Sequence, residues 1–226
     1  MADILGLAPY LPASRPRGAA RWWAATGALG PSRLVLERLA ECETPPPVTS
    51  PCGLAAPCSL PAPFLDFLGL RRSLDLDGPP DRLFRRTRAF AAAATRGQRQ
   101  PLRVPHESMP VLDRRRLPLF LAALPLLRSD AAPHIVEIDT SAVLSALDLP
   151  HRGLSGTMPE AVDRRAHVLA RLAEGAFGFP VVAAQRDYAV ASLPALAAVV
   201  ACAMAARVVR DGLRRPADAE TWVPLP

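Results

Sequence analysis

The chain contains neither lysine nor asparagine, so all 27 of its basic side chains other than histidine are arginines. Lysine and asparagine have A-rich codons, and a GC-rich genome enriches alanine, arginine, proline and glycine whatever the protein does. The net charge of +6 and the pI near 10 would otherwise indicate a polyanionic partner. Codon bias is an alternative source of this arginine-rich composition, so charge alone does not assign a nucleic-acid partner. The absence of lysine also excludes a Walker-type phosphate loop.

Cysteine is scarce as well, with one residue each at Cys42, Cys52, Cys58 and Cys202. Their number does not fit a disulfide framework, and the gaps of nine and five residues between the first three do not fit a zinc knuckle. No serine or cysteine stands in a Gly-x-Ser-x-Gly setting. The first residues lack the charged start and long apolar run of a signal peptide. We therefore expect a cytoplasmic chain.

One long segment lacks charge altogether, residues 188–206, between Asp187 and Arg207. Its length fits a membrane span of about 20 residues. However, nine of its nineteen residues are alanine, and Tyr188 is its single interfacial anchor. This composition favours a helix that packs against protein over one that contacts a membrane. A small membrane protein is the alternative.

Half of the residues are hydrophobic, which is enough for one sizeable core, and we predict a single domain over residues 1–226. Short apolar or alternating segments separated by glycine and proline predict three opening strands that form an antiparallel ribbon. These strands are residues 2–8, 18–26 and 32–39. Because adjacent strand residues face opposite sides, we interpret Trp22 and Trp23 as core residues, with base stacking as the alternative.

Two polar or proline-rich segments lie inside the predicted domain. Residues 44–63 hold seven prolines and are predicted to be a wound loop around a short strand. Residues 96–110 are predicted to be a mobile loop or lid. Between them, residues 81–95 place apolar side chains on one face and arginines on the other, which predicts an amphipathic helix. The candidate phosphate-binding residues on its basic face are Arg82, Arg85 and Arg86. A solvated face is the alternative.

The segment HIVEID, residues 134–139, is the best strand in the sequence. Glu137 and Asp139 are two residues apart, so in a strand both carboxylates would lie on one face. A metal site or an acid/base pair needs that arrangement, although a solvated edge strand would show the same pattern. The helix signals that follow predict a helix over residues 157–175, with Thr157 as N-cap, and a last helix that includes residues 188–210.

Several of these segments, in this order, resemble the family called domain of unknown function 429, whose members are predicted to have an RNase H-like fold. The resemblance covers nearly the whole chain. The matching segments are GLAAPCSLP at residues 53–61, PPDRLFRR at 79–86, VEIDTSAVLSALDLP at 136–150, the helix ALAAVVACAMAARVVRDG, and ETWVPLP at the end.

The resemblance implies an α/β fold with an RNase H-like mixed sheet: three N-terminal antiparallel strands plus further strands, with helices packed on it. In this fold, carboxylates on the first strand, a middle strand and the last helix bind divalent metal ions, which clamp the attacking and leaving oxygens of a phosphodiester. The matching positions here carry Ala8, Ala55 and Ala197. Glu137 alone stays where the family keeps an acid.

Two functional hypotheses follow. The first is a catalytically degenerate nuclease relative that acts as a binding or assembly module without a cofactor, with a nucleic acid or a protein as partner. The alternative is an active metal-dependent phosphodiesterase that uses Glu137, Asp139 and Asp187 as catalytic residues with Mg²⁺ or Mn²⁺. The sequence leaves the oligomeric state and the substrate open.

Overall fold

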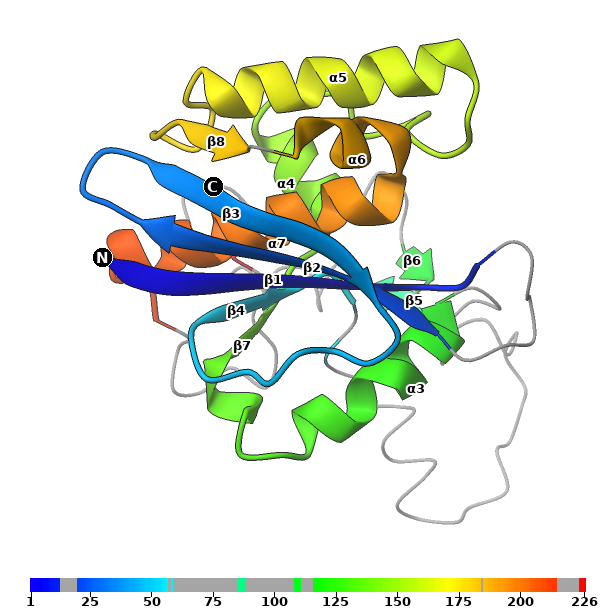
Figure 1. Ribbon diagram of the computed structural model, residues 1–226. Helices are drawn as coiled ribbons and strands as arrows, with labels where there is room; N and C mark the ends of the chain where they lie inside the picture. The colour runs from blue at the N-terminus through cyan, green and yellow to red at the C-terminus, as the bar shows by residue number, and fades with distance from the viewer. Residues whose placement is uncertain are drawn as a thin grey trace.

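The computed structural model describes residues 1–12, 20–56, 58, 85–87, 108–110, 116–183, 185–214 and 224–226. These residues form a mixed six-stranded sheet with helices packed on it, and a separate two-stranded sheet (Figure 1). The predicted α/β class with a mixed sheet is therefore confirmed.

The first three strands form an antiparallel meander, as the sequence predicted. They are β1 (Ala2–Tyr10), β2 (Arg21–Leu29) and β3 (Leu34–Cys42). Each ends two or three residues later than its predicted boundary. The turn from β2 to β3 is closed by the Gly30 amide, which donates to the Arg33 carbonyl at 2.9 Å.

Three short strands extend this meander in parallel. β4 (Cys52–Leu54) pairs with β1, β7 (Ile135–Glu137) pairs with β4, and β8 (Val181–Ala183) pairs with β3. The strand order is β7-β4-β1-β2-β3-β8. β1, β4 and β7 therefore run in one direction, and their carboxyl ends lie at the same edge of the sheet. β4 is the short strand predicted inside residues 44–63, whereas β8 lies in a segment that showed no strand signal.

β1 continues through Pro9, although proline suggested the end of the strand. The Leu5 amide donates to the Pro51 carbonyl and the Leu7 carbonyl accepts from the Ala55 amide, so odd-numbered residues of β1 direct their backbone groups toward β4. Pairing with β4 stops at Leu7. The missing N–H of Pro9 therefore leaves no sheet hydrogen bond unmade.

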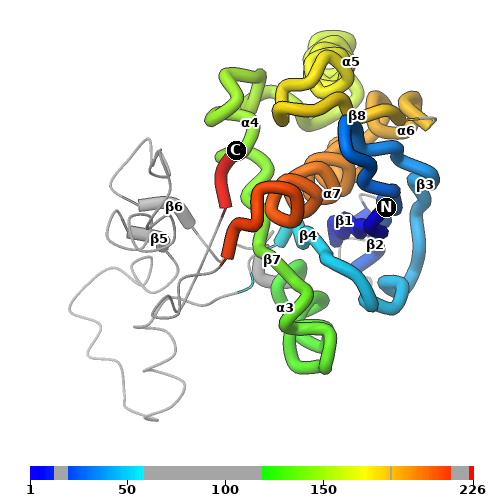
Figure 2. The backbone as a smooth tube through the Cα atoms, turned by 90° about the vertical axis from the view of Figure 1, so that its left-hand side faces the viewer, coloured from blue at the N-terminus to red at the C-terminus, as the bar shows by residue number. Residues whose placement is uncertain are grey.

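The last helix, α7 (Leu193–Arg210), lies in the centre of the domain, and the sheet curves around it (Figure 2). Helix and strands approach to backbone contact. A Cβ atom added at Gly6 would lie 2.2 Å from the Ala198 carbonyl oxygen, and one added at Gly53 would lie 2.1 Å from the Ala201 carbonyl oxygen. Only glycine on the strands and small side chains on the helix allow this approach. The alanine-rich composition is thus the packing surface of a core helix.

α7 is long and apolar enough to cross a membrane when judged by length and composition, and it is the one such helix among the described residues. Within the structure, 61% of its residues are buried inside the domain. Burial of this extent is typical of the core helix of a globular domain and agrees with the preference for protein packing.

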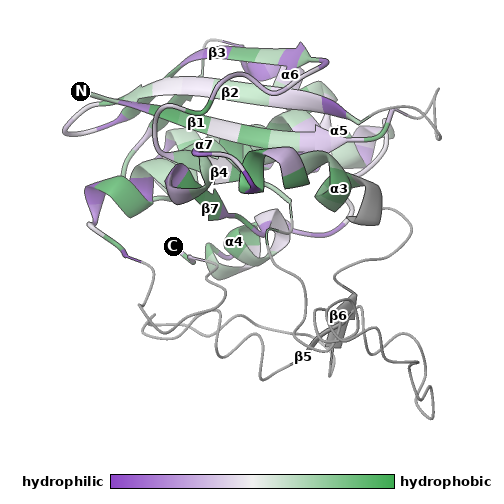
Figure 3. Cartoon of the chain, turned by 90° about the horizontal axis from the view of Figure 1, so that it is seen from below, coloured by the Kyte–Doolittle hydropathy of each residue, from purple (hydrophilic) through white to green (hydrophobic). Residues whose placement is uncertain are grey.

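The other helices divide between the two faces of the sheet. Those on the side of α7 are α4 (Thr140–Ala146), α5 (Pro159–Ala173) and α6 (Arg186–Ala191). α3 (Arg116–Leu127) packs on the opposite face through Ala123, in a cluster with Leu5 and Leu7. Figure 3 shows α3 and β1 largely in the hydrophobic colour. Trp22 lies in the α3-side core and Trp23 in the α7-side core, as the core interpretation required.

The prediction of an amphipathic helix over residues 81–95 is wrong for residues 85–87. Arg85–Thr87 forms strand β5, which pairs antiparallel with β6 (Ser108–Pro110), the end of the predicted loop. Arginine is a good helix former, so local propensity favoured a helix, and pairing with a segment about twenty residues away decides the outcome. Arg82 and the rest of residues 81–84 and 88–107 lie outside the described residues.

Two helix boundaries also differ from prediction. Met158, rather than Thr157, is the N-cap of α5, and no side chain caps that end. The predicted last helix is two helices, α6 and α7, separated at Ser192, whose backbone is extended. Pro194 explains the break, because its ring clashes with the carbonyl four residues earlier in a continuous helix. Ser192 then caps α7 by accepting a hydrogen bond from the Ala195 amide.

Candidate functional site

Ala8, Ala55 and Ala197, where the resemblance led us to expect acids, lie at one edge of the sheet. The Ala55 amide donates to the Leu7 carbonyl at 2.7 Å, which places Ala55 beside Ala8 at the carboxyl ends of β4 and β1. Residues two apart in a strand face the same side. Because Gly6 lies under α7, Ala8 also faces α7. Ala55 follows the last residue of β4 and packs against the same α7-side core.

Ala197 lies on the same side. It precedes Ala201 by four residues, or about one helical turn, and the Ala201 carbonyl lies over Gly53. α7 runs opposite to β1, since Cys202 contacts Ile4 and Ala198 lies over Gly6. One turn toward the start of α7 is therefore a step toward Ala55. Ala8 belongs to the α7-side core, and Ala55 and Ala197 pack against it.

An aromatic pair closes the site next to Ala8. Trp23 of β2 is the cross-strand partner of Ala8 and faces the same side. The ring of Tyr188 in α6 lies against it, with 5.9 Å between ring centroids. Trp23 is 9% exposed and Tyr188 is 53% exposed. The surroundings of Ala8 are therefore apolar and aromatic, which is a poor environment for a divalent cation.

Glu137 lies at the same edge of the sheet but faces the opposite side. It is in register with Leu54, which packs in the α3-side core. The side chain is buried, and its Oε2 accepts a hydrogen bond from the Cys58 amide at 2.9 Å. This carboxylate therefore holds the segment that leaves β4, and it is directed away from the three alanines.

Asp139 has a different role from the predicted one. β7 ends at Glu137, so Asp139 is outside the strand, and the prediction that both carboxylates lie on one strand face is wrong. Asp139 is the N-cap of α4, where its Oδ1 accepts from the Ala142 amide at 3.1 Å. The spacing predicted a strand face, but the strand ends two residues before the cap.

Asp187 lies in the first turn of α6 and is exposed. It is on the α7 side of the sheet, whereas Glu137 faces the α3 side, so these two carboxylates do not converge. Among the described residues, no group of three His, Cys, Asp or Glu side chains is placed to hold a metal ion. Arg85 and Arg86 lie in β5, whose side chains are outside the described part of the structure.

A polar cluster that the sequence did not reveal lies at the end of β1. The Tyr10 hydroxyl donates to Glu41 of β3, and Arg21 of β2 pairs with the same carboxylate at 2.8 Å. Burial and the hydrogen bond to Glu41 raise the pKa of Tyr10 to about 12. Strand register alone brings these residues together. The carboxylate nearest to the alanine positions in the meander is thus already occupied by an arginine and a tyrosine.

Arg165 of α5 is a second feature missed by sequence reasoning. Its side chain is fully buried, and its guanidinium donates to four backbone carbonyls. These belong to Leu154, Gly156, Val190 and Ala191, at 2.5–3.3 Å. In a continuous helix the Val190 carbonyl would face the nitrogen of Pro194, which has no hydrogen, so Arg165 takes the carbonyls that the break between α6 and α7 leaves free. Burial lowers the pKa of Arg165.

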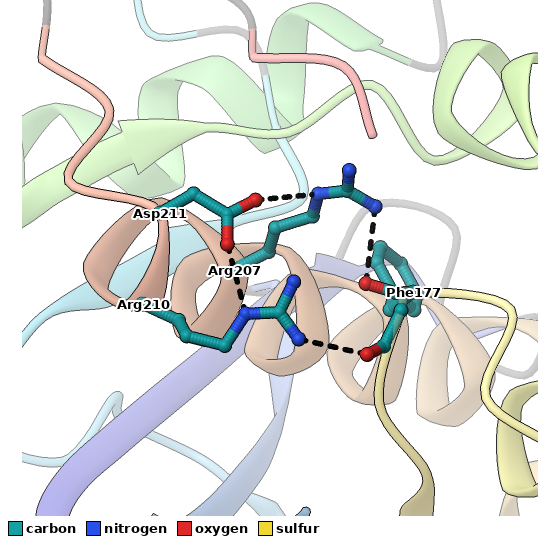
Figure 4. Close-up of polar contacts among 5 residues, drawn as sticks. Phe177, Arg207, Arg210 and Asp211 are labelled. Atoms are coloured by element: carbon teal, nitrogen blue, oxygen red, sulfur yellow. Dashed lines mark hydrogen bonds and ion pairs between the residues drawn. The ribbon is translucent and has the colours of Figure 1, made fainter. Parts of the chain in front are cut away.

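Two more arginines have structural roles at the end of α7 (Figure 4). Arg207 donates to the Phe177 carbonyl at 3.0 Å, and Arg210 donates to the Gly178 carbonyl at 2.9 Å and lies over the Phe179 ring. Both also bind Asp211. The hydrogen bond from Arg210 lowers the pKa of Asp211. These arginines tie α7 to the loop before β8, so they are not free contacts for a polyanion.

Comparison with known proteins identifies no relative. The chain matches no family model, no curated protein and no solved structure. The site therefore consists of three alanines and an aromatic pair on the α7 side of the sheet, and of one carboxylate, bound to a backbone amide, on the α3 side.

Proposed function

We propose that this protein is an RNase H-like domain that has lost its metal-binding carboxylates and acts as a non-catalytic binding or assembly module. The observation that carries the proposal is the convergence of Ala8, Ala55 and Ala197. These three positions are far apart in the sequence, yet strand register and helix packing bring them to one side of one sheet edge. A set of acids at these positions would form a metal site, and alanines there form a small apolar surface.

The architecture supports the same proposal. Three N-terminal antiparallel strands, further strands parallel to the first, and a last helix packed over the first strand are the parts that an RNase H-like arrangement requires. Fold alone does not fix function. The proposal therefore depends on the site, where the apolar side chains of Ala8 and Trp23 stand in place of the expected carboxylates.

The alternative, a metal-dependent phosphodiesterase using Glu137, Asp139 and Asp187, has less support. Each of the first two already binds a backbone amide, and the first and third lie on opposite sides of the sheet. A two-metal site needs several oxygen ligands directed at one point. No described contact favours that arrangement for these three residues.

Metal binding and cleavage test the proposal directly. We expect calorimetric titration of the wild-type protein with Mn²⁺ to give no heat of binding, and labelled DNA and RNA to stay intact in the presence of Mn²⁺ or Mg²⁺. Binding and cleavage that both disappear in Glu137→Gln would overturn the proposal and establish the nuclease alternative.

Restoring the acids tests the placement of the site. Ala55→Asp/Ala197→Asp uses the two partly exposed positions, and Ala8→Asp adds the buried one. We expect the double variant to gain weak Mn²⁺ binding and the triple variant, if it folds, to bind more tightly. If neither variant binds Mn²⁺ although circular dichroism shows the native fold, the three alanines do not mark a former metal site.

The partner in this proposal is a nucleic acid or a protein. Fluorescence anisotropy with labelled single-stranded RNA, single-stranded DNA and duplex DNA separates the two. Binding that weakens steeply between low and high salt indicates a nucleic acid, because phosphate contacts release counterions. Because Arg165, Arg207 and Arg210 already have structural roles, weak or absent binding is the expected result, which would leave a protein partner.

A further inference from the structure

We propose that α6 is a flap that opens independently of α7 and, when open, uncovers the edge of the sheet at Trp23 and Ala8. This inference concerns the mobility of α6 and holds whether or not the protein is an RNase H-like module. It rests on how α6 is attached to the rest of the domain.

α6 is short and contributes little to the core. It has six residues, and Ala189 is its one buried residue. α7, which follows directly in the chain, has eleven buried residues. Segments with few buried apolar side chains open locally at a free energy well below that of global unfolding.

Individual side chains attach α6 to its surroundings. Gln185 accepts a hydrogen bond from the Leu39 amide at the free part of the β3 edge, at 2.5 Å, and Arg186 donates to the Ala166 carbonyl at 3.2 Å. Tyr188 lies against Trp23. At the other end, Arg165 holds the Val190 and Ala191 carbonyls. None of these contacts is a strand-pair hydrogen bond of the large sheet, and the rest of the attachment is the packing of α6 against α5 and α7.

The junction with α7 allows this motion. Ser192 has an extended backbone with φ of −134° and ψ of 124°, and it caps α7 through the Ala195 amide. In the first turn of α7, the Ala195 amide therefore donates to the Ser192 side chain, and Pro194 has no N–H that would need an acceptor. Opening of α6 breaks the bond from the Ser192 amide to the Tyr188 carbonyl but leaves α7 intact.

Opening would expose the candidate site. Trp23 is 9% exposed while Tyr188 covers it, and Ala8 is its cross-strand neighbour. Removing Tyr188 from this position gives access to the apolar side chains of Ala8 and Trp23, which are cross-strand neighbours on β1 and β2. α6 thus controls whether a partner can reach that surface.

Hydrogen exchange measured by mass spectrometry tests the proposal on the intact protein. We expect peptides covering residues 188–192 to have protection factors at least about 100-fold lower than peptides covering residues 195–206, with little dependence on added urea. Exchange of both regions with the same free energy and the same urea dependence would overturn the proposal, because it would show one cooperative unit.

The contact with Trp23 provides a matched pair of variants. Tyr188→Ala removes the ring and should raise exchange in α6 by about 3- to 10-fold, the fold-change expected for one aromatic contact. Tyr188→Phe keeps the ring and should leave exchange unchanged. Neither variant should alter exchange in α7. Equal exchange in α6 for the alanine variant and the wild type, or a parallel increase in α7, would contradict the role of Tyr188 as the contact that holds the flap closed.

Discussion

The uncharged run of residues 188–206 supplies the last four residues of α6 and most of α7, yet the two helices are attached to the domain in different ways. α7 lies at backbone distance from two strands, because Gly6 and Gly53 leave room for its carbonyls. α6 is held by side-chain contacts and buries only Ala189. α6 also begins with the charged residues Arg186 and Asp187, whereas α7 is apolar along most of its length. The attachment of an apolar helix therefore depends on the surface it meets as well as on its own composition.

The largest expected effect tests the close approach of α7. Gly53→Ala would place a methyl group 2.1 Å from the Ala201 carbonyl oxygen, so the helix and strand must separate. We expect the free energy of unfolding to fall by roughly 3 kcal/mol or more, at the upper end of the cost of overpacking. Urea denaturation followed by circular dichroism measures the change.

Gly30→Ala is the matched control for that variant. A Cβ added at Gly30 would lie 3.6 Å from the Arg33 carbonyl oxygen, an ordinary van der Waals distance. Its effect should stay within about 0.5 kcal/mol. A Gly53→Ala protein as stable as Gly30→Ala would mean that α7 does not depend on glycine for its position.

The next effect concerns the junction between the two helices. Arg165→Met keeps most of the side-chain volume but removes the donors to four carbonyls, two of them at the end of α6. Leaving such groups without a partner should cost about 2 kcal/mol in total, since water can reach some of them. Thermal and urea unfolding measure this loss.

Arg164→Met is the control, because Arg164 is exposed and donates to a single carbonyl, that of Arg152. We expect it to change stability by less than about 0.5 kcal/mol. Equal losses of stability for both variants would show that Arg165 does not stabilise the break between α6 and α7.

A smaller effect distinguishes the cap that the structure uses from the one that the sequence suggested. Ser192→Ala removes the side chain that accepts from the Ala195 amide and should cost about 1 kcal/mol. Thr157→Ala should have almost no effect, because Met158 is the N-cap of α5 and no side chain caps it. Urea midpoints of the two variants give the comparison, and the reverse ranking would show that the caps are assigned incorrectly.

The smallest effect depends on pH and concerns the far end of α7. The hydrogen bond from Arg210 lowers the pKa of Asp211 in the folded state. A lowered carboxyl pKa stabilises the fold above the unfolded-state pKa, near 4, and this contribution disappears as the pH falls through the folded-state value. Wild type should therefore be more stable than Asp211→Asn by about 0.5 kcal/mol at pH 6, and the difference should decrease below pH 4 and vanish once the pH is below the folded-state pKa of Asp211.

Unfolding at 1 M NaCl provides the control for this effect, since salt screens partly exposed ion pairs. The difference between wild type and Asp211→Asn should shrink at high salt at pH 6. A difference that stays constant from pH 2 to pH 7 would show that Asp211 does not contribute through its charge.

Much of the sheet followed from local pattern. The three opening strands alternate or are continuously apolar and are separated by glycine and proline, so their existence and antiparallel pairing could be predicted. β8 and β5 could not. The segment of β8 showed no strand signal and the arginines of β5 favour a helix, so pairing with a distant partner decided both. The break at Ser192 had a local signal in Pro194, but the uniform hydropathy of the run concealed it.

The candidate site divides in the same way. Matching of motifs pointed to Ala8, Ala55 and Ala197 as positions of interest, and the structure brings them together. Motif matching could not show which side of the sheet Glu137 faces, because that depends on register with Leu54. Nor could it show the cluster of Tyr10, Arg21 and Glu41, which exists only where three strands lie side by side.

The sequence alone thus determined the opening meander, the helix signals at Pro159 and the presence of a buried alanine-rich helix, since each depends on neighbouring residues. The tertiary structure decided which helix beside Pro194 lies in the core, that the Glu137 carboxylate binds a backbone amide, and that Arg165 replaces missing helical hydrogen bonds. Each of these outcomes requires contacts between segments remote in sequence, whose free energies no local pattern encodes.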